Sequence, residues 1–229
     1  MKTLFVSGTD TDVGKTWVSC QILAELRRRG FRMGAWKPVC SGAVRQHGRL
    51  LWEDIRSLAS AIGVHDTDIT LMDRICAHRF QAPMAPNVAA RLEGRVLADH
   101  DLVTGLDAWR DDADLVLIEG AGGLLSPVSD GMLVAELAQR LVSPTVIVSA
   151  NRLGTIHQTL ATVEAAESRG IKVSAVVLNE VSPDLDPVLL QTNKDELKRL
   201  MPGVLLCTVE HGGEVCGLSQ EVDFLQWFE

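Results

Sequence analysis

The chain has 229 residues with 46% hydrophobic content, and its 22 Lys and Arg against 30 Asp and Glu give a net charge of -8. This length suits one α/β domain with a sizeable buried core, and the acidic balance argues against a nucleic-acid surface, which needs clustered cations. Five cysteines without metal-ligand spacing indicate reduced thiols. We expect a cytoplasmic protein without a targeting or membrane-spanning segment.

Short runs rich in Val, Ile and Leu alternate with helix-like stretches, a pattern typical of β-α-β units. Strands are expected at residues 3–7, 32–36, 115–119, 145–150, 173–179 and 204–207. Helices are expected at 15–29 and 154–169, ended by Gly30 and Gly170, with weaker patterns at 52–62, 98–110, 132–141 and 186–200. Residues 40 to about 95 show no clear strand and should pass over the strand ends. The pattern predicts one α/β domain over residues 1–229, a mostly parallel sheet with helices on both faces.

Residues 8–16, GTDTDVGKT, lie between the first expected strand and the first expected helix, the context that a phosphate-binding loop requires. Its backbone N–H groups can face phosphates, while the lysine supplies charge to the β/γ region and the last threonine offers a hydroxyl to magnesium. The first glycine is Gly8, one position before the ordinary spacing. The alternative is a glycine-rich turn without a ligand. The loop predicts a P-loop NTPase-like fold that binds nucleotide through Asp12, Val13, Gly14, Lys15 and Thr16.

Charged residues end two further expected strands. Lys37 follows the second strand and could neutralise another anionic group, or it could be a solvated surface lysine. Glu119 ends the strand at 115–119 and precedes the flexible turn GAGG at 120–123. A carboxylate at this sheet edge could bind magnesium, although an ordinary strand-end glutamate is the alternative.

Two other polar residues have uses that the sequence leaves open. Asp54 lies near a helix start, where an acid often only complements the helix dipole, so taken alone it indicates a cap more than a metal ligand. Asn179 closes an expected strand and could present its amide to a purine ring, or it could form a turn.

Taken in order, GTDTDVGKT, KPVCSG at 37–42, Asp54, EGAGGLLSPVSD at 119–130 and LGTIH at 153–157 resemble dethiobiotin synthetases. The resemblance spans residues 8 to about 179 and implies a homodimeric, ATP-dependent carbon–nitrogen ligase of biotin biosynthesis. Such enzymes join carbon dioxide to 7,8-diaminopelargonate and give dethiobiotin, ADP and phosphate. The reaction passes through a carbamate and a carbamic-phosphoric anhydride.

The resemblance also implies a role for each matching residue. Lys15 and Lys37 would stabilise the carbamate and the transferring phosphoryl group, and the hydroxyls of Thr11 and Ser41 would contact the substrate or intermediate. The implied magnesium ligands are Thr16, Asp54 and Glu119. The implied substrate contacts are Gly122 and Gly123 to the diamine, and Gly154, Thr155, Ile156 and His157 to the substrate carboxylate in the partner subunit. Asn179 would recognise adenine.

Some positions depart from the family pattern. His157 stands where the family usually has asparagine and Gln158 where it has histidine, and Ala85-Pro86-Asn87 replaces Ser-Pro-His. The proline usual after the last strand is also missing near Val209.

Two other P-loop classes are alternatives. A MinD/ParA-like regulatory ATPase usually has an extra lysine early in the loop, where this chain has Thr9, Asp10 and Thr11, and no amphipathic membrane helix is expected at 222–229. A cobyrinate-type amidotransferase would need a glutaminase domain, which is not expected after Glu229.

Overall fold

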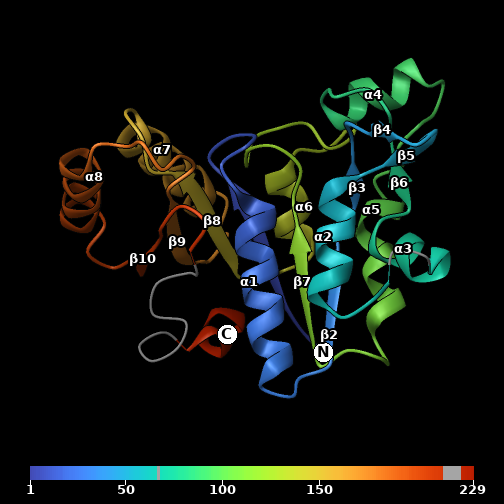
Figure 1. Ribbon diagram of the computed structural model, residues 1–229, viewed down its shortest axis with the longest axis horizontal. Helices are drawn as coiled ribbons and strands as arrows, with labels where there is room; N and C mark the ends of the chain where they lie inside the picture. Colours follow the sequence, from blue (N-terminus) through green and yellow to red (C-terminus); the bar gives the residue numbers. More distant parts are fainter. Residues whose placement is uncertain (66–67, 214–222) are drawn as a thin grey trace.

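The computed structural model describes residues 1–65, 68–213 and 223–229, and its centre is a six-stranded parallel sheet (Figure 1). The strand order is β10-β9-β8-β1-β7-β2. The bounds of these strands are β1 Lys2–Gly8, β2 Met33–Trp36, β7 Leu115–Glu119, β8 Thr145–Ala150, β9 Val173–Asn179 and β10 Leu206–Val209. Parallel pairing brings all six carboxyl ends to one edge, where α/β sheets bind ligands.

Helices cover both faces of this sheet (Figure 1). Their bounds are α1 Lys15–Arg28, α2 Glu53–Ala61, α3 Ile69–Ile75, α4 Pro86–Leu92, α5 Asp101–Thr104, α6 Val134–Arg140, α7 Thr155–Glu167 and α8 Pro187–Leu200, with 3-10 turns η1 Gly105–Trp109 and η2 Phe224–Phe228. Alternate side chains of β8 point to opposite faces of the sheet. Val146 and Val148 belong to the main core, and Ile147 packs on the other face with Val163 of α7 and Leu197 of α8. The predicted parallel α/β architecture is confirmed.

The sheet strands agree closely with the sequence-based expectation. Strands β7, β8 and β9 have the predicted bounds. The last strand was expected at 204–207 but is β10, Leu206–Val209, because parallel pairing with β9 runs from Leu206 opposite Val176 to Val209 opposite Asn179. Pairing with β9 therefore sets the bounds of β10, which the apolar run alone placed two residues too early.

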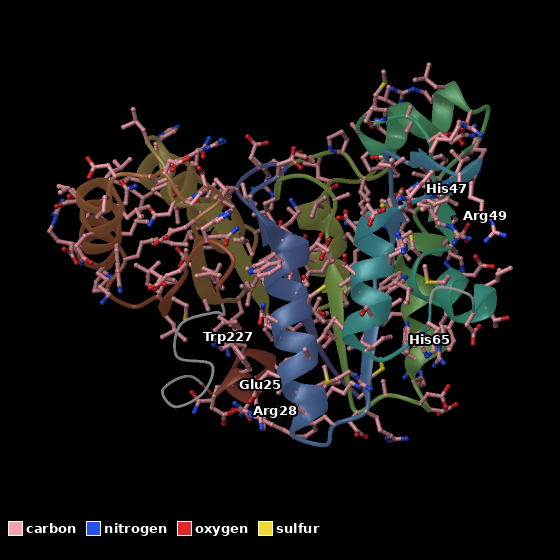
Figure 2. The ribbon with its side chains drawn as sticks, viewed as in Figure 1. Glu25, Arg28, His47, Arg49, His65 and Trp227 are labelled. Atoms are coloured by element: carbon pink, nitrogen blue, oxygen red, sulfur yellow. The ribbon has the colours of Figure 1, made fainter. Side chains whose placement is uncertain are left out.

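The expectation of no strand between residues 40 and 95 was wrong. Strands β3 (Val39–Cys40) and β6 (His78–Arg79) pair in parallel, and β4 (Val44–Gln46) and β5 (Arg49–Leu51) form an antiparallel hairpin. Strands of two or three residues are too short to show a period of two. The hairpin turns at His47 and Gly48, both at positive φ, and Figure 2 shows His47 and Arg49 on its outer side.

The expected helix at 98–110 was also wrong in part. The segment consists of the short helix α5 followed by the 3-10 turn η1, and the change occurs at Gly105. A side chain at this position would lie 2.8 Å from Trp36, so close packing favours glycine. Glycine is a poor residue for a helix interior, which accounts for the interruption.

The end of α1 farthest from the phosphate loop is fixed by local charges and by the chain terminus. Glu25 accepts hydrogen bonds from Arg28 at 2.8 and 2.9 Å, and both residues lie at this end of α1 in Figure 2. Nearby, Trp227 of η2 is buried and packs edge-on against Phe224 with ring centroids 4.7 Å apart. The carbonyl of Trp227 accepts a hydrogen bond from Ser174, which ties η2 to β9.

Candidate active site

The phosphate loop joins β1 to α1 and needs its glycine. Gly14 has φ +92° and directly precedes α1. A Cβ atom here would lie 2.0 Å from the Asn179 amide nitrogen, because that amide donates a 3.0 Å hydrogen bond to the Val13 carbonyl. Asp12 also has positive φ, +57°. The predicted loop residues therefore form one tight turn at the end of β1, with Asn179 of β9 pressed against it.

Neighbouring strands hold the loop at both ends. The Thr9 N–H donates to the Val148 carbonyl at 2.9 Å, and the Leu124 N–H donates to the Gly8 carbonyl at 3.0 Å. These bonds tie the loop to β8 on one side and to the segment after β7 on the other. Hydrogen bonds within the protein thus hold the loop in this geometry.

Lys15 lies inside this loop. Its ammonium group donates a 2.9 Å hydrogen bond to the Asp10 carbonyl, and the residue is 7% exposed. Burial lowers the pKa of Lys15, and the opposing effect of the nearby Glu119 carboxylate, which raises this pKa, is smaller. The loop therefore keeps a desolvated cation next to the backbone N–H groups at the start of α1, an arrangement suited to a polyphosphate.

Four predicted site residues, each from a different segment of the chain, meet next to the loop. Lys37, which follows β2, donates hydrogen bonds of 2.6 Å to both Asp54 of α2 and Glu119 at the end of β7. The Thr16 hydroxyl of α1 donates to the same Glu119 oxygen at 2.8 Å. Strands β2 and β7 are neighbours, with Trp36 opposite Ile118, so Lys37 and Glu119 leave the sheet side by side.

Burial of Glu119 and Lys37 strengthens the interactions between the charges of this cluster. Glu119 is 0% exposed and the Lys37 side chain 5%, whereas the Asp54 side chain is 44% exposed. Burial opposes the positive charge of Lys37, but the two carboxylates outweigh it and raise its pKa well above the usual value. Burial likewise opposes the charge of Asp54, and the Lys37 ammonium prevails and lowers the pKa of this carboxyl. Both groups are charged at neutral pH.

The donors in this cluster suit a hard cation. Among the described residues, the second carboxylate oxygen of Glu119 is buried without a hydrogen-bond partner. The Thr16 hydroxyl and the Asp54 carboxylate supply further oxygens, the ligand type that magnesium prefers. The described part of the chain holds no group of three or more His, Cys, Asp or Glu residues that could hold a metal, so water and ligand oxygens would complete the coordination. Asp54 is not the residue that caps α2, since Trp52 holds that position.

The glycine turn after Glu119 packs against the phosphate loop. Gly122 has φ +73°, and a Cβ atom there would lie 2.6 Å from the Ser126 hydroxyl and 3.7 Å from that of Thr11. The Gly123 N–H donates to the same Ser126 hydroxyl at 2.9 Å. The turn therefore lies beside the exposed Thr11.

Ser41 follows the short strand β3 at the edge of the excursion. Its hydroxyl donates a 2.7 Å hydrogen bond to the Met84 carbonyl, and the neighbouring Gly42 N–H donates to the Ala82 carbonyl at 3.1 Å. In the structure Ser41 thus joins two segments of the excursion. Its predicted contact with substrate stays a prediction.

The segment predicted to reach a partner subunit begins α7. Gly154 has φ +94°, and both Gly154 and His157 are exposed, whereas Ile156 is half-buried. Thr155 is fully buried, its N–H donates to the Arg152 carbonyl at 3.0 Å, and its hydroxyl lies 2.8 Å from that of Ser149. The Thr155 side chain therefore faces the protein interior.

Ser149 is a buried residue that connects α7 with the phosphate loop, and the sequence analysis missed it. Its hydroxyl accepts hydrogen bonds from Thr9 at 3.3 Å and from Thr159 at 2.9 Å. A serine inside an apolar strand pattern has no distinguishing feature in the sequence.

Asn179 lies at the end of β9 and supports the phosphate loop. The residue is 6% exposed, and its carbonyl accepts a 2.7 Å hydrogen bond from the Asn151 N–H. With its amide nitrogen bound to Val13, the side chain has a structural role. Contact with adenine remains a prediction.

Comparisons with known proteins fit this site. A family model described as an AAA domain matches residues 2–215. The ATP-dependent dethiobiotin synthetase BioD of Phenylobacterium zucineum is 41% identical over 194 residues, covering 84% of this chain and 82% of that protein. The protein of the same name from Caulobacter vibrioides is 40% identical over 195 residues, covering 82% and 85%. The chain belongs to the dethiobiotin synthetase family. This membership confirms the resemblance that the motifs indicated.

Solved structures of other proteins share the fold of this chain. Cell division protein FtsY of Thermotoga maritima has a TM-score of 0.50 at 15% identity, covering 100% of this chain and 67% of that one. Signal recognition particle receptor FtsY of Elizabethkingia anophelis has a TM-score of 0.54 at 15% identity, covering 99% and 64%. At this identity the likeness concerns the fold alone.

The regulatory ATPase alternative is not favoured beside these dethiobiotin synthetase relatives. Within residues 1–65, 68–213 and 223–229, no helix is both long enough and apolar enough to cross a membrane.

The buried ion cluster yields a stability prediction. Lys37→Met leaves the Glu119 carboxylate buried without its cation, which should lower the free energy of unfolding by about 3 to 5 kcal/mol. Lys37→Met/Glu119→Gln removes the unpaired charge and should recover most of this loss. Urea-induced unfolding measures the free energy of unfolding of the wild type and of each variant.

Lys2→Met is the matched control, because Lys2 pairs with Glu229 at 3.3 Å with both side chains largely exposed. Exposed ion pairs contribute about 0 to 1 kcal/mol. A Lys37→Met variant as stable as Lys2→Met would contradict the tight burial of this cluster.

Proposed function

We propose that the chain is an ATP-dependent dethiobiotin synthetase, which carboxylates 7,8-diaminopelargonate and closes its cyclic urea. The observation that carries the proposal is the bridge from Lys37 to Asp54 and Glu119 next to the phosphate loop. A nucleotide loop alone is compatible with many activities. A second buried lysine beside it suits a reaction that brings two anions together.

The reaction needs a carbamate and a triphosphate in contact. One substrate amine attacks carbon dioxide and loses a proton to give the carbamate, whose oxygen then attacks the γ-phosphorus and displaces ADP. The second amine attacks the carbamoyl carbon and expels phosphate, which closes the ring. Lys15 can exchange its bond to the Asp10 carbonyl for phosphate oxygens, and Lys37 can stabilise the carbamate and the transferring phosphoryl group.

Positioning supplies much of the rate in this account. Aligning two reacting groups can remove about 7 to 11 kcal/mol of barrier. The rigid strand ends that carry Lys37 and Glu119 suit this role, and Thr11 and the turn at Gly122 and Gly123 would line the diamine side. Ser41 would contribute its hydroxyl from the excursion.

We also propose that the site uses magnesium. When bound, magnesium would neutralise charge on the β- and γ-phosphate oxygens. Thr16, Asp54 and Glu119 would hold it, and the unpartnered buried oxygen of Glu119 supports this assignment. Asn179 would meet the adenine from the end of β9.

Reduced thiols support the proposed cytoplasmic location. Among the described residues, Cys20, Cys40 and Cys76 are free thiols. Burial raises the pKa of the Cys40 thiol to about 11, which keeps it protonated and unreactive at neutral pH.

An assay with the diamine, bicarbonate, magnesium and ATP tests the proposal. We expect cyclic urea and ADP in equal amounts, and no ATP hydrolysis when either the diamine or the carbon source is omitted. Asp54→Asn should lower kcat/KM by roughly 10- to 1000-fold, because it weakens a proposed magnesium ligand and removes the carboxylate charge that helps to position Lys37. Lys2→Met serves as the control and should keep wild-type activity. ATP hydrolysis independent of the diamine would instead favour a regulatory ATPase.

We further propose a homodimer in which the start of α7 reaches the partner's substrate carboxylate. Gly154 and His157 are exposed, as is the neighbouring Leu153 with an exposed fraction of 85%. Backbone N–H groups at a helix start favour an anion. His157→Asp should abolish synthesis, because it adds a negative charge where the carboxylate would bind.

A purified heterodimer of His157→Asp and Lys37→Met/Glu119→Gln subunits tests this arrangement. If each site uses α7 of the partner, one of the two sites is intact, and about half of the wild-type activity should return. Each homodimer of a variant is the control. A heterodimer as inactive as its parents would argue that both residues belong to the same subunit's site.

A further inference from the structure

The two sides of the phosphate loop differ, which defines a direction for a bound nucleotide. In the sheet, β7 and β2 lie on one side of β1, and β8, β9 and β10 lie on the other. Lys37 and Glu119 both belong to the first side, together with the hydroxyl of Thr16. If the terminal phosphate meets these groups, the nucleoside must extend the opposite way, toward the ends of β9 and β10.

A large aromatic residue stands on that opposite side. Trp17 follows Thr16 in the first turn of α1, and its indole N–H donates a 3.2 Å hydrogen bond to the Gly213 carbonyl, beyond the end of β10. Nearby chain is also ordered by hydrogen bonds: the His211 ring lies 3.2 Å from the Glu180 carbonyl, and the Glu180 N–H donates to the Val209 carbonyl at 2.9 Å. Trp17 therefore spans from the phosphate loop to the segment after β10.

Trp17 is also unusual among the five tryptophans in its exposure. The residue is 44% exposed, whereas Trp36, Trp109 and Trp227 are buried and Trp52 is half-buried with its N–H bonded to the Phe80 carbonyl. Exposing an indole at the first turn of α1 leaves apolar surface uncovered. A flat apolar ligand would cover it.

We infer that Trp17 packs its ring against the nucleoside of the bound nucleotide and strengthens purine binding. The inference rests on the proposed function, because it takes ATP as the ligand and its terminal phosphate next to Lys37. Aromatic rings stack on nucleobases and stabilise binding through dispersion and burial of both faces. The bond from the indole N–H to Gly213 fixes the ring at one edge and reduces the entropy lost on stacking.

Binding of ADP and of inorganic tripolyphosphate to Trp17 variants tests the inference. Trp17→Ala should weaken ADP binding by about 5- to 150-fold, the range expected for one lost base–aromatic stack, and Trp17→Phe should keep most of the affinity. Tripolyphosphate has no nucleoside, so its affinity should be equal in all three proteins. Isothermal titration calorimetry measures each dissociation constant. Leu200→Ala, an exposed apolar truncation on α8, is the matched control.

Tryptophan fluorescence gives a second readout. ADP should shift the emission of the wild-type protein to shorter wavelength, and the shift should vanish in Trp17→Phe. Equal ADP affinity in Trp17→Ala and wild type would overturn the inference, as would an equal loss of ADP and tripolyphosphate affinity, which indicates damage to the loop. Failure of the wild type to bind ADP would instead contradict the proposed function.

Discussion

The bridge from Lys37 to Glu119 and Asp54 is the interaction on which the site depends. A fully buried carboxylate is stable as an anion only with a cation and hydrogen bonds around it, and Glu119 receives both, from Lys37 and from Thr16. This requirement fixes the relative positions of β2, β7, α1 and α2 at the ligand edge of the sheet. In the proposed reaction, the same groups would supply the charges that phosphoryl transfer needs.

The bridge also explains how the protein itself holds the groups next to the phosphate loop in place. Lys37 lies 2.6 Å from both carboxylates, so its positive charge balances negative charge that would otherwise repel ATP. The loop itself is held by backbone bonds to the β8 and β7 sides. A site that is built before binding loses little energy on reorganisation when the reactants arrive.

The sheet strands and the family motifs could largely be predicted from the sequence. Strands β7, β8 and β9 were predicted with their bounds because they are continuous apolar runs, buried on both faces. The two- and three-residue strands β3 to β6 were not, since such short strands show no period of two, and β3 pairs with β6 from a distant part of the chain.

The site could be predicted as a set of residue types but not as an arrangement. Asp54 looked like a capping residue, and only the packing of α2 against α1 brings it to Lys37. Likewise, the bonds from Asn179 to Val13 and from Thr9 to Ser149 depend on the order of strands in the sheet. A single strand-end residue in the sequence says nothing about which strand lies next to it.

Transfer of oxygen from bicarbonate to phosphate tests the central claim, carbamate phosphorylation, most directly. With ¹⁸O-labelled bicarbonate, diamine and unlabelled ATP, the carbamate oxygen that attacks the γ-phosphorus should leave with the phosphate when the ring closes. Mass spectrometry of the released phosphate should therefore find one ¹⁸O atom for each dethiobiotin formed. Cyclic urea formed together with unlabelled phosphate would contradict the account.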